Sequence, residues 1–133
     1  MIQETNATKI RLVNCSKTFE DGTHALNPIN LEIKGGETVV LLGPSGCGKT
    51  TTLRMIAGLE SPDAGGQIFF GDEDVTQKPI EQRNVGMVFQ SYALFPNMSV
   101  RQNIAYGMKI RKTPKNKLDH RVDEMLNMMR IDE

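Results

Sequence analysis

Residues 43–51 carry the side chains best suited to chemistry. They form a glycine-rich run that ends in a lysine and two threonines, Gly43-Pro44-Ser45-Gly46-Cys47-Gly48-Lys49-Thr50-Thr51. This run matches the pattern G-x-x-x-x-G-K-[ST], in which glycines let the backbone turn its N–H groups toward phosphate oxygens. The spacing therefore predicts a phosphate-binding loop, and its predicted ligand is a nucleotide.

Two residues of this loop have distinct predicted roles. Lys49 would place a full positive charge beside the β- and γ-phosphates, and the hydroxyl of Thr50 would bind Mg²⁺. A helix that begins near Lys49 would direct its free N–H groups and the positive end of its dipole at the same anion. All nine residues of the run are predicted to contact the nucleotide.

The elements around the loop support this prediction. Residues 39–42 are four apolar residues without alternation, which is typical of a strand buried on both faces. Residues 51–57 favour a helix, and Gly58 is suited to end it. Residues 85–89 form a second apolar run and predict another buried strand, with Gln90 at its carboxyl end. Because ligands of open α/β sheets bind at the carboxyl ends of strands, we expect Gln90 and the loop at one edge.

Other segments predict a smaller sheet and a helical end. Residues 9–14 and 29–33 alternate polar and apolar side chains, which indicates half-buried antiparallel strands, and Asp21-Gly22 predicts a turn. Residues 67–70 predict a short strand, and residues 78–83 one helical turn. Ser99 and Gln102 form a capping box that opens a helix to about residue 108. Apolar residues at helical spacing over 118–129 predict a helix that packs on its neighbour, and residues 109–117 a solvated basic linker.

Length and composition limit the class of protein. The chain has 133 residues, 38% of them hydrophobic, with zero net charge and two cysteines. One soluble domain is expected, without a field that would favour nucleic acid. The two cysteines predict no disulfide framework, and a reducing cytosol is expected. No apolar run is long enough to span a membrane and no secretory signal is evident, so membrane association is expected only through a partner.

Two longer segments together resemble a known family. One is the phosphate loop followed by Arg54-Met55-Ile56-Ala57-Gly58-Leu59, and the other is residues 85–96, which contain Phe89-Gln90-Ser91-Tyr92. They resemble the ATP-binding subunit of ABC transporters, and more narrowly the bacterial importers for sugars, polyamines, ferric iron, sulfate or phosphonates. The resemblance extends from about Lys9 to the end of the chain.

The resemblance implies an α/β fold, a RecA-like P-loop NTPase core that is incomplete in this sequence. It implies antiparallel strands of a β subdomain over about residues 1–38. The phosphate-loop core would occupy residues 39–96, and the start of a helical subdomain residues 97–133.

The resemblance also implies further site residues. Gln90 would be the glutamine of the Q-loop, which reaches Mg²⁺ and the attacking water, and Phe19 would stack on adenine. An apolar segment would be the surface on which a membrane subunit docks: Tyr92, Ala93, Leu94, Phe95 and Pro96. The implied cofactors are ATP and Mg²⁺. The implied partners are membrane-spanning permease subunits, a second copy of the ATPase and, indirectly, a solute-binding protein, at the inner face of the cell membrane.

The sequence also departs from the family. It contains no Leu-Ser-Gly-Gly-Gln signature, no apolar strand ending in Asp-Glu and no switch histidine in the matching place. We therefore expect this chain to bind ATP without hydrolysing it appreciably. Two alternatives stay open at this point. One is a self-contained nucleotide-binding or regulatory protein without turnover, or a gene remnant; the other is a different phosphate-loop enzyme, such as a kinase or GTPase, for which no guanine motif or acceptor site is expected.

Overall fold

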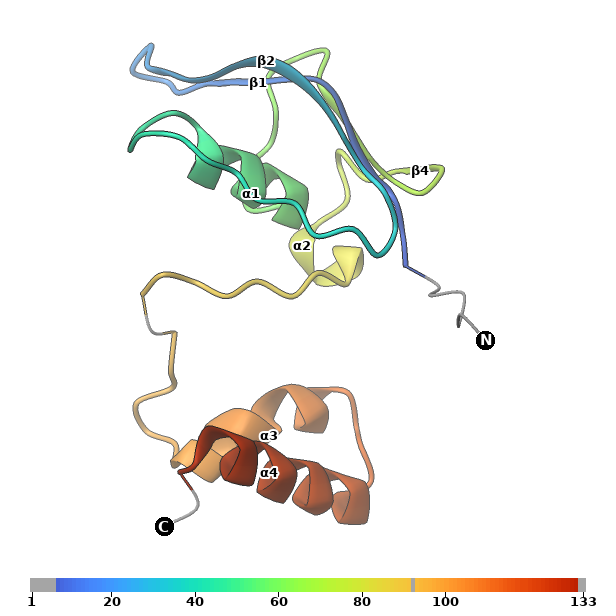
Figure 1. Ribbon diagram of the computed structural model, residues 1–133, viewed down its shortest axis with the longest axis vertical. Helices are drawn as coiled ribbons and strands as arrows, with labels where there is room; N and C mark the ends of the chain where they lie inside the picture. Colours follow the sequence, from blue (N-terminus) through green and yellow to red (C-terminus); the bar gives the residue numbers. More distant parts are fainter. Residues whose placement is uncertain (1–6, 92, 132–133) are drawn as a thin grey trace. The chain divides into compact units, whose positions relative to one another are not determined.

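The computed structural model describes residues 7–91 and 93–131. The chain divides into two compact units, Met1–Met87 and Val88–Glu133, each of which is described by itself. The first unit contains a small sheet, helix α1 (Lys49–Ala57) and the single turn α2 (Ile80–Arg83), and the second contains two longer helices (Figure 1). Among the described residues, no helix combines the length and the apolar character that crossing a bilayer requires.

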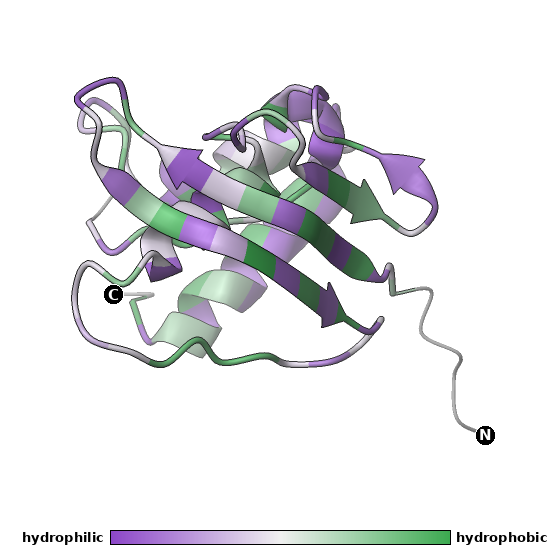
Figure 2. Cartoon of the chain, turned by 90° about the horizontal axis from the view of Figure 1, so that it is seen from above, coloured by the Kyte–Doolittle hydropathy of each residue, from purple (hydrophilic) through white to green (hydrophobic). Residues whose placement is uncertain are grey.

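The sheet of the first unit is antiparallel throughout. Its strands are β1 (Ile10–Thr18), β2 (His24–Ile33), β3 (Gln67–Phe70) and β4 (Glu73–Asp74), in the spatial order β2-β1-β3-β4. Hydrophobic and hydrophilic residues alternate along β1 and β2 (Figure 2). The predicted antiparallel strands, the short strand over 67–70 and the turn at Asp21-Gly22 are confirmed.

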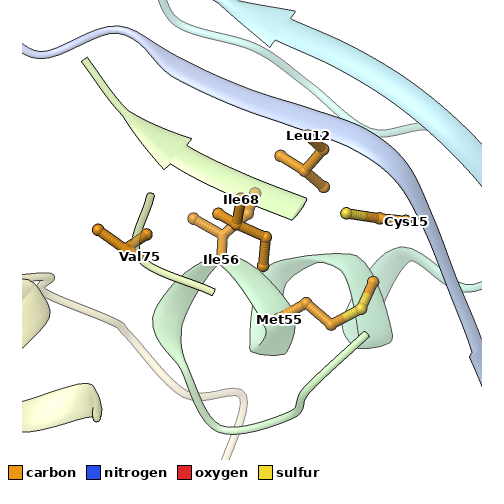
Figure 3. Close-up of a cluster of buried hydrophobic side chains, with 6 residues drawn as sticks. All are labelled: Leu12, Cys15, Met55, Ile56, Ile68 and Val75. Atoms are coloured by element: carbon orange, nitrogen blue, oxygen red, sulfur yellow. The ribbon is translucent and has the colours of Figure 1, made fainter. Parts of the chain in front are cut away.

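The core of the first unit lies between the sheet and α1. Side chains from β1 and β3 meet two residues of α1 and one residue that follows β4 (Figure 3). The buried members are Leu12, Cys15, Met55, Ile56, Ile68 and Val75. Burial raises the pKa of the Cys15 thiol, which donates a hydrogen bond to the Gln67 carbonyl at 3.3 Å. The core therefore holds α1 by its apolar face, through Met55 and Ile56.

A buried arginine completes the end of α1. The helix ends at Gly58 as predicted, whose N–H donates to the carbonyls of Arg54 and Met55. The guanidinium of Arg83, which is 6% exposed, donates to the carbonyls of Met55 (2.9 Å) and Ile56 (3.2 Å). It also donates to two carbonyls of the loop before α2, Thr76 and Lys78. Desolvation lowers the pKa of Arg83 from its ordinary high value, and the group remains a cation at the negative end of the helix dipole.

Two predicted strands are wrong for the described chain. Residues 39–42 and 85–89 are extended but belong to no sheet, and their side chains are largely open to solvent. Val40 is 71% exposed, Leu42 88% and Val88 98%. A buried parallel strand needs hydrogen-bonding neighbours on both sides and cover on both faces. The described residues provide neither, so the apolar runs keep their composition but form no ladder. Gln90 consequently follows an irregular segment, not a strand end.

The second unit is a helical hairpin of α3 (Val100–Ile110) and α4 (Lys115–Met129). The capping box is present as predicted, because the hydroxyl of Ser99 accepts from the Gln102 N–H and the Gln102 side chain accepts from the Ser99 N–H. Four buried side chains join the helices: Ala105, Leu118, Val122 and Leu126. The predicted packing of the apolar stripe on a neighbouring helix is therefore confirmed for these residues, while Met129 is exposed.

Candidate phosphate site and its surroundings

The backbone of the predicted phosphate loop takes a conformation that glycine favours. Gly46 has φ of 81° and Gly48 has φ of 91°, both in the left-handed region. A Cβ at Gly48 would also lie 2.8 Å from the Ala25 carbonyl oxygen and from a methyl group of Leu26. The loop therefore turns sharply and lies directly against β2 immediately before α1 begins. Left-handed residues of this kind belong to the backbone conformations in which successive N–H groups can bind an anion.

The first turn of α1 follows the loop without a side-chain cap. Gly48 is the N-cap residue, no side chain accepts from the first N–H groups, and the turn contains no acidic residue. Of the threonines, Thr52 is buried and its hydroxyl donates to the Gly48 carbonyl at 2.8 Å, which fixes the turn. Thr50 is exposed and Thr51 half-buried. The helix N-terminus thus offers its dipole and a free hydroxyl to an anion and its metal ion.

Lys49 lies across the mouth of the loop. Its ammonium donates to the carbonyl oxygens of Gly43 and Pro44, the latter at 2.9 Å. Within residues 7–91 and 93–131, Lys49 forms no ion pair. The two loop carbonyls therefore hold the ammonium at the start of the loop, where a cation can pair with an anionic ligand.

The remaining loop residues form its exposed outer side. Ser45 and Cys47 are exposed, and the Cys47 N–H donates to the Pro44 carbonyl at 3.3 Å. A Cβ at Gly43 would lie 2.7 Å from the Cys47 sulfur, so the thiol packs against the start of the loop. Any group attached to this sulfur would stand beside the loop backbone.

Phe19 directly follows β1 and is 40% exposed. Its N–H and carbonyl are both held in the turn to β2, where they bond to Thr23 and Gly22 at 2.9 Å. The ammonium of Lys17 lies 5.6 Å from the centre of the ring, in cation–π contact with one face. The ring therefore combines an anchored backbone with substantial exposure, as an aromatic group that stacks on a base must.

The other predicted site residues belong to the second unit. Gln90 and the segment 93–96 are exposed, with Leu94 68% exposed and Phe95 43%. Tyr92, which was predicted for the docking surface, lies outside the described residues. Because Gln90 and Thr50 stand in different units, the predicted shared Mg²⁺ site is not described by the structure. Among the described residues, no group of three or more His, Cys, Asp and Glu could hold a metal ion by itself.

An asparagine that the sequence did not single out organises the predicted docking segment. The side-chain oxygen of Asn103 accepts from the Phe95 N–H at 2.9 Å, and its amide donates to the carbonyls of Phe95, Met98 and Ser99. The ring of Phe95 also packs on Tyr106, with centroids 4.4 Å apart. The turn over residues 95–99 is therefore fixed to α3. The sequence signal that could have indicated this role is the position of Asn103, four residues after the capping Ser99.

One tetrapeptide matches the Asn-Lys-x-Asp pattern by which GTPases recognise guanine, contrary to the expectation that the sequence has none. Residues 116–119 are Asn-Lys-Leu-Asp. They lie inside the first turns of α4, and Leu118 is buried against α3. The match therefore belongs to a helical hairpin and stands at no strand end, whereas ligands of α/β sheets bind where strands end.

Comparison with known proteins decides the family. Residues 26–133 match the sequence model of a family described as "ABC transporter". The chain belongs to this family. It is 56% identical over 126 residues to the sulfate/thiosulfate import ATP-binding protein CysA 2 of Agrobacterium fabrum, covering 93% of the chain and 36% of that protein. It is 53% identical over 124 residues to the spermidine/putrescine import ATP-binding protein PotA of Vibrio cholerae, covering 93% and 32%. The chain thus spans about a third of these relatives' length.

Solved structures of the ABC family share the fold. A dimer of the ATP-binding cassette MJ0796, in a post-hydrolysis state bound to ADP and Pi, gives a TM-score of 0.80 at 28% identity. The match covers 93% of this chain and 58% of that one. The structure of CbiO1 from Clostridium perfringens, part of an ABC transporter complex, gives 0.77 at 32% identity and covers 95% and 52%. The resemblance to an ABC ATP-binding subunit is therefore confirmed, and with it the P-loop ATPase fold class over the matched residues.

Proposed function

We propose that this chain is part of the ATP-binding subunit of an ABC import system and binds Mg-ATP through residues 43–51. The observation that carries the proposal is the geometry at the point where the loop ends and α1 begins. There, two left-handed glycines, an uncapped helix N-terminus and a lysine without an ion pair among the described residues meet at one point. The named relatives, which are import ATP-binding proteins, support the same function.

The proposed site divides the nucleotide among separate residues. Loop N–H groups and Lys49 hold the phosphate oxygens, and the exposed hydroxyl of Thr50 binds the metal ion together with those oxygens. A Mg²⁺ ion held there would neutralise part of the charge on the phosphates. Phe19 stacks on adenine. Gln90 is a second Mg²⁺ ligand and senses the nucleotide, a role that rests on the resemblance of residues 85–96 to the Q-loop.

We further propose that residues 1–133 by themselves bind ATP without hydrolysing it. Lys49 and the loop amides can stabilise charge on the phosphates, but the printed sequence has no Asp-Glu strand end, no signature run and no switch histidine. Phosphoryl transfer to water depends on such groups to position the nucleophile and to balance charge in the transition state.

The proposed partners follow from the family and from the exposed segment of the second unit. Ala93, Leu94, Phe95 and Pro96 are all exposed, and Asn103 binds the backbone N–H and carbonyl of Phe95. We propose that this segment, with Tyr92, docks on a membrane-spanning permease subunit. A second copy of the ATPase subunit would complete the motor, and a solute-binding protein would act through the permease. This places the protein at the inner face of the cell membrane, with no nucleic-acid partner.

The proposal is tested by calorimetric titration of the purified chain with ATP and Mg²⁺. Lys49→Ala should weaken binding by about tenfold or more, because hydrogen bonds to charged groups contribute about 1.5–3 kcal/mol. Lys9→Ala is the matched control, since Lys9 forms only an exposed ion pair with Glu32, and its affinity should equal that of the parent chain. Equal affinities of the parent and Lys49→Ala chains would exclude the proposed phosphate site.

Turnover is measured in the same preparations. We expect no release of phosphate above that of the Lys49→Ala chain. Steady hydrolysis that this substitution abolishes would contradict the non-hydrolysing role and leave ATP binding intact. Absence of binding by the parent chain would refute the proposed function as a whole.

A further inference from the structure

The end of β1 is held by the loop that follows α1. The carboxylate of Asp63 accepts from the Thr18 N–H at 3.1 Å and from the Ser16 hydroxyl at 3.2 Å. The Asp63 N–H in turn donates to the Ser16 carbonyl at 2.9 Å. Three hydrogen bonds thus connect one residue of the loop to the last three residues of β1, which directly precede Phe19.

A second set of contacts lies beside the first. The ammonium of Lys17 donates to the Ser61 carbonyl at 3.0 Å and pairs with Glu60 at 3.1 Å. Both partners of this ion pair are largely buried, with side chains 17% and 24% exposed. The same ammonium lies over one face of the Phe19 ring. One face of the ring is therefore covered by a cation whose position the loop fixes, so a base would stack on the other face.

The charge state of Asp63 suits this role. The N–H of Thr18 is the main cause that holds the pKa of the Asp63 carboxyl below its ordinary value, with the Ser16 hydroxyl and the charge of Lys17 acting in the same direction. The group is an anion at neutral pH and keeps both acceptor oxygens. None of the four residues in these contacts, Ser16, Lys17, Thr18 and Asp63, belongs to the buried core of the first unit.

We propose that Asp63 is a positioning residue for adenine recognition, acting through Thr18 on Phe19. The two ends of α1 then serve the two ends of one nucleotide. Its first turn holds the phosphates, and the loop after its last turn sets the aromatic ring. This inference rests on the proposed function, specifically on stacking of Phe19 on adenine. It adds Ser16, Lys17 and Asp63 to the residues assigned to nucleotide recognition, although none of them belongs to the phosphate loop or stacks on the base.

The test compares two ligands on the full chain, Mg-ATP and Mg-tripolyphosphate. The ratio of their dissociation constants isolates the contribution of adenosine from that of the phosphates. Aromatic stacking adds about 0.5–1.5 kcal/mol, so Phe19→Ala should lower the preference for ATP by about twofold to twelvefold. Asp63→Ala should lower it by a similar factor and leave tripolyphosphate affinity unchanged. Asp63→Asn keeps an acceptor for the Thr18 N–H and should recover most of the preference.

Asp74→Ala is the matched control. Asp74 also accepts from a backbone N–H and a hydroxyl two residues on, both of Thr76, and its pKa is lowered for that reason. Asp74 stands in β4, which pairs with β3 at the edge of the sheet, so its substitution should leave the ratio unchanged. Circular dichroism of each variant establishes that the chain is folded, and Ser16→Ala, which removes one hydrogen bond only, gives a milder second variant.

The outcomes separate the inference from the function on which it rests. A loss of preference in Phe19→Ala but not in Asp63→Ala or Ser16→Ala would overturn the positioning role and leave the adenine site standing. If Asp63→Ala weakened the binding of ATP and of tripolyphosphate by the same factor, Asp63 would have a general structural role, and the positioning role would be overturned as well. An unchanged ratio in Phe19→Ala would remove the adenine contact and the inference together, while Lys49 and the phosphate loop would be unaffected.

Discussion

Replacing Arg83 by methionine should destabilise the first unit far more than loss of an ordinary surface charge. The guanidinium is 6% exposed and donates to four carbonyl oxygens, at 2.8, 2.9, 3.1 and 3.2 Å. Methionine fills part of the same volume but leaves those carbonyls without this donor. Hydrogen bonds to a charged group contribute about 1.5–3 kcal/mol each, but the losses are not additive. We expect a cost of about 3 kcal/mol, because several carbonyl oxygens lose a charged donor together.

The two cysteines provide an assay within the chain. Cys47 is exposed and should react with a thiol reagent at once, whereas Cys15 has no exposed surface and should react only when the first unit opens. When the unit opens and recloses faster than the reagent reacts, the slow labelling rate is proportional to the fraction of open chains. A cost of about 3 kcal/mol therefore predicts slow-phase labelling about 150-fold faster in Arg83→Met, since 1.36 kcal/mol is a factor of ten.

Arg101→Met is the matched control, because Arg101 pairs with Asp123 in a bridge whose side chains are about half exposed. Such a bridge contributes less than about 1 kcal/mol, so labelling of Cys15 should scarcely change. The labelling rate of Arg83→Lys should lie between those of the parent chain and Arg83→Met. An ammonium has three donors on one atom and cannot reach all four carbonyl oxygens as the guanidinium does. Equal labelling rates for Arg83→Met and Arg101→Met would refute the view that Arg83 closes the end of α1.

Three other changes have defined outcomes. Gly48→Ala should weaken ATP binding and destabilise the first unit by about 1–3 kcal/mol, measured by the same titration and labelling, because its Cβ would meet the Ala25 carbonyl in a left-handed backbone. A bulky reagent on Cys47 should block ATP binding and ATP should protect the thiol; full affinity after complete modification would contradict this. Because folding raises the pKa of Cys15, the unfolded chain loses that proton first, so urea stability should fall as pH rises above the ordinary thiol pKa, and less so in Cys15→Ala.

Local features of the fold were predictable because each depends on residues close in the chain. The Gly58 helix end, the Asp21-Gly22 turn and the Ser99 capping box all involve bonds that span three or four residues. The phosphate loop was equally accessible, since its glycines, Lys49 and the start of α1 are contiguous. Its conformation could be inferred from residue types alone.

Contacts between distant residues were not predictable from local patterns. Arg83 is 27 and 28 residues from the carbonyls that it binds in α1, and Asp63 is 45 from Thr18. In the sequence, Arg83 stands among charged and polar neighbours and suggests a solvated surface. The prediction of buried strands over 39–42 and 85–89 was wrong because it also depends on distant residues. Composition indicates that a segment suits a buried strand, but the neighbours that would pair with it must come from elsewhere.

The position of β1 inside the sheet also has a consequence for the order of folding. β1 is synthesised first, yet it lies between β2 and β3, with Leu12 opposite both Leu31 and Ile68. Its pairing with β2 closes a short loop, whereas pairing with β3 must wait for a segment more than fifty residues later. Until then, the inner edge of β1 is an unpaired strand edge, the kind of surface that joins other chains. Slow synthesis between residues 34 and 66 would prolong that exposure, because the edge is closed only when β3 pairs with it.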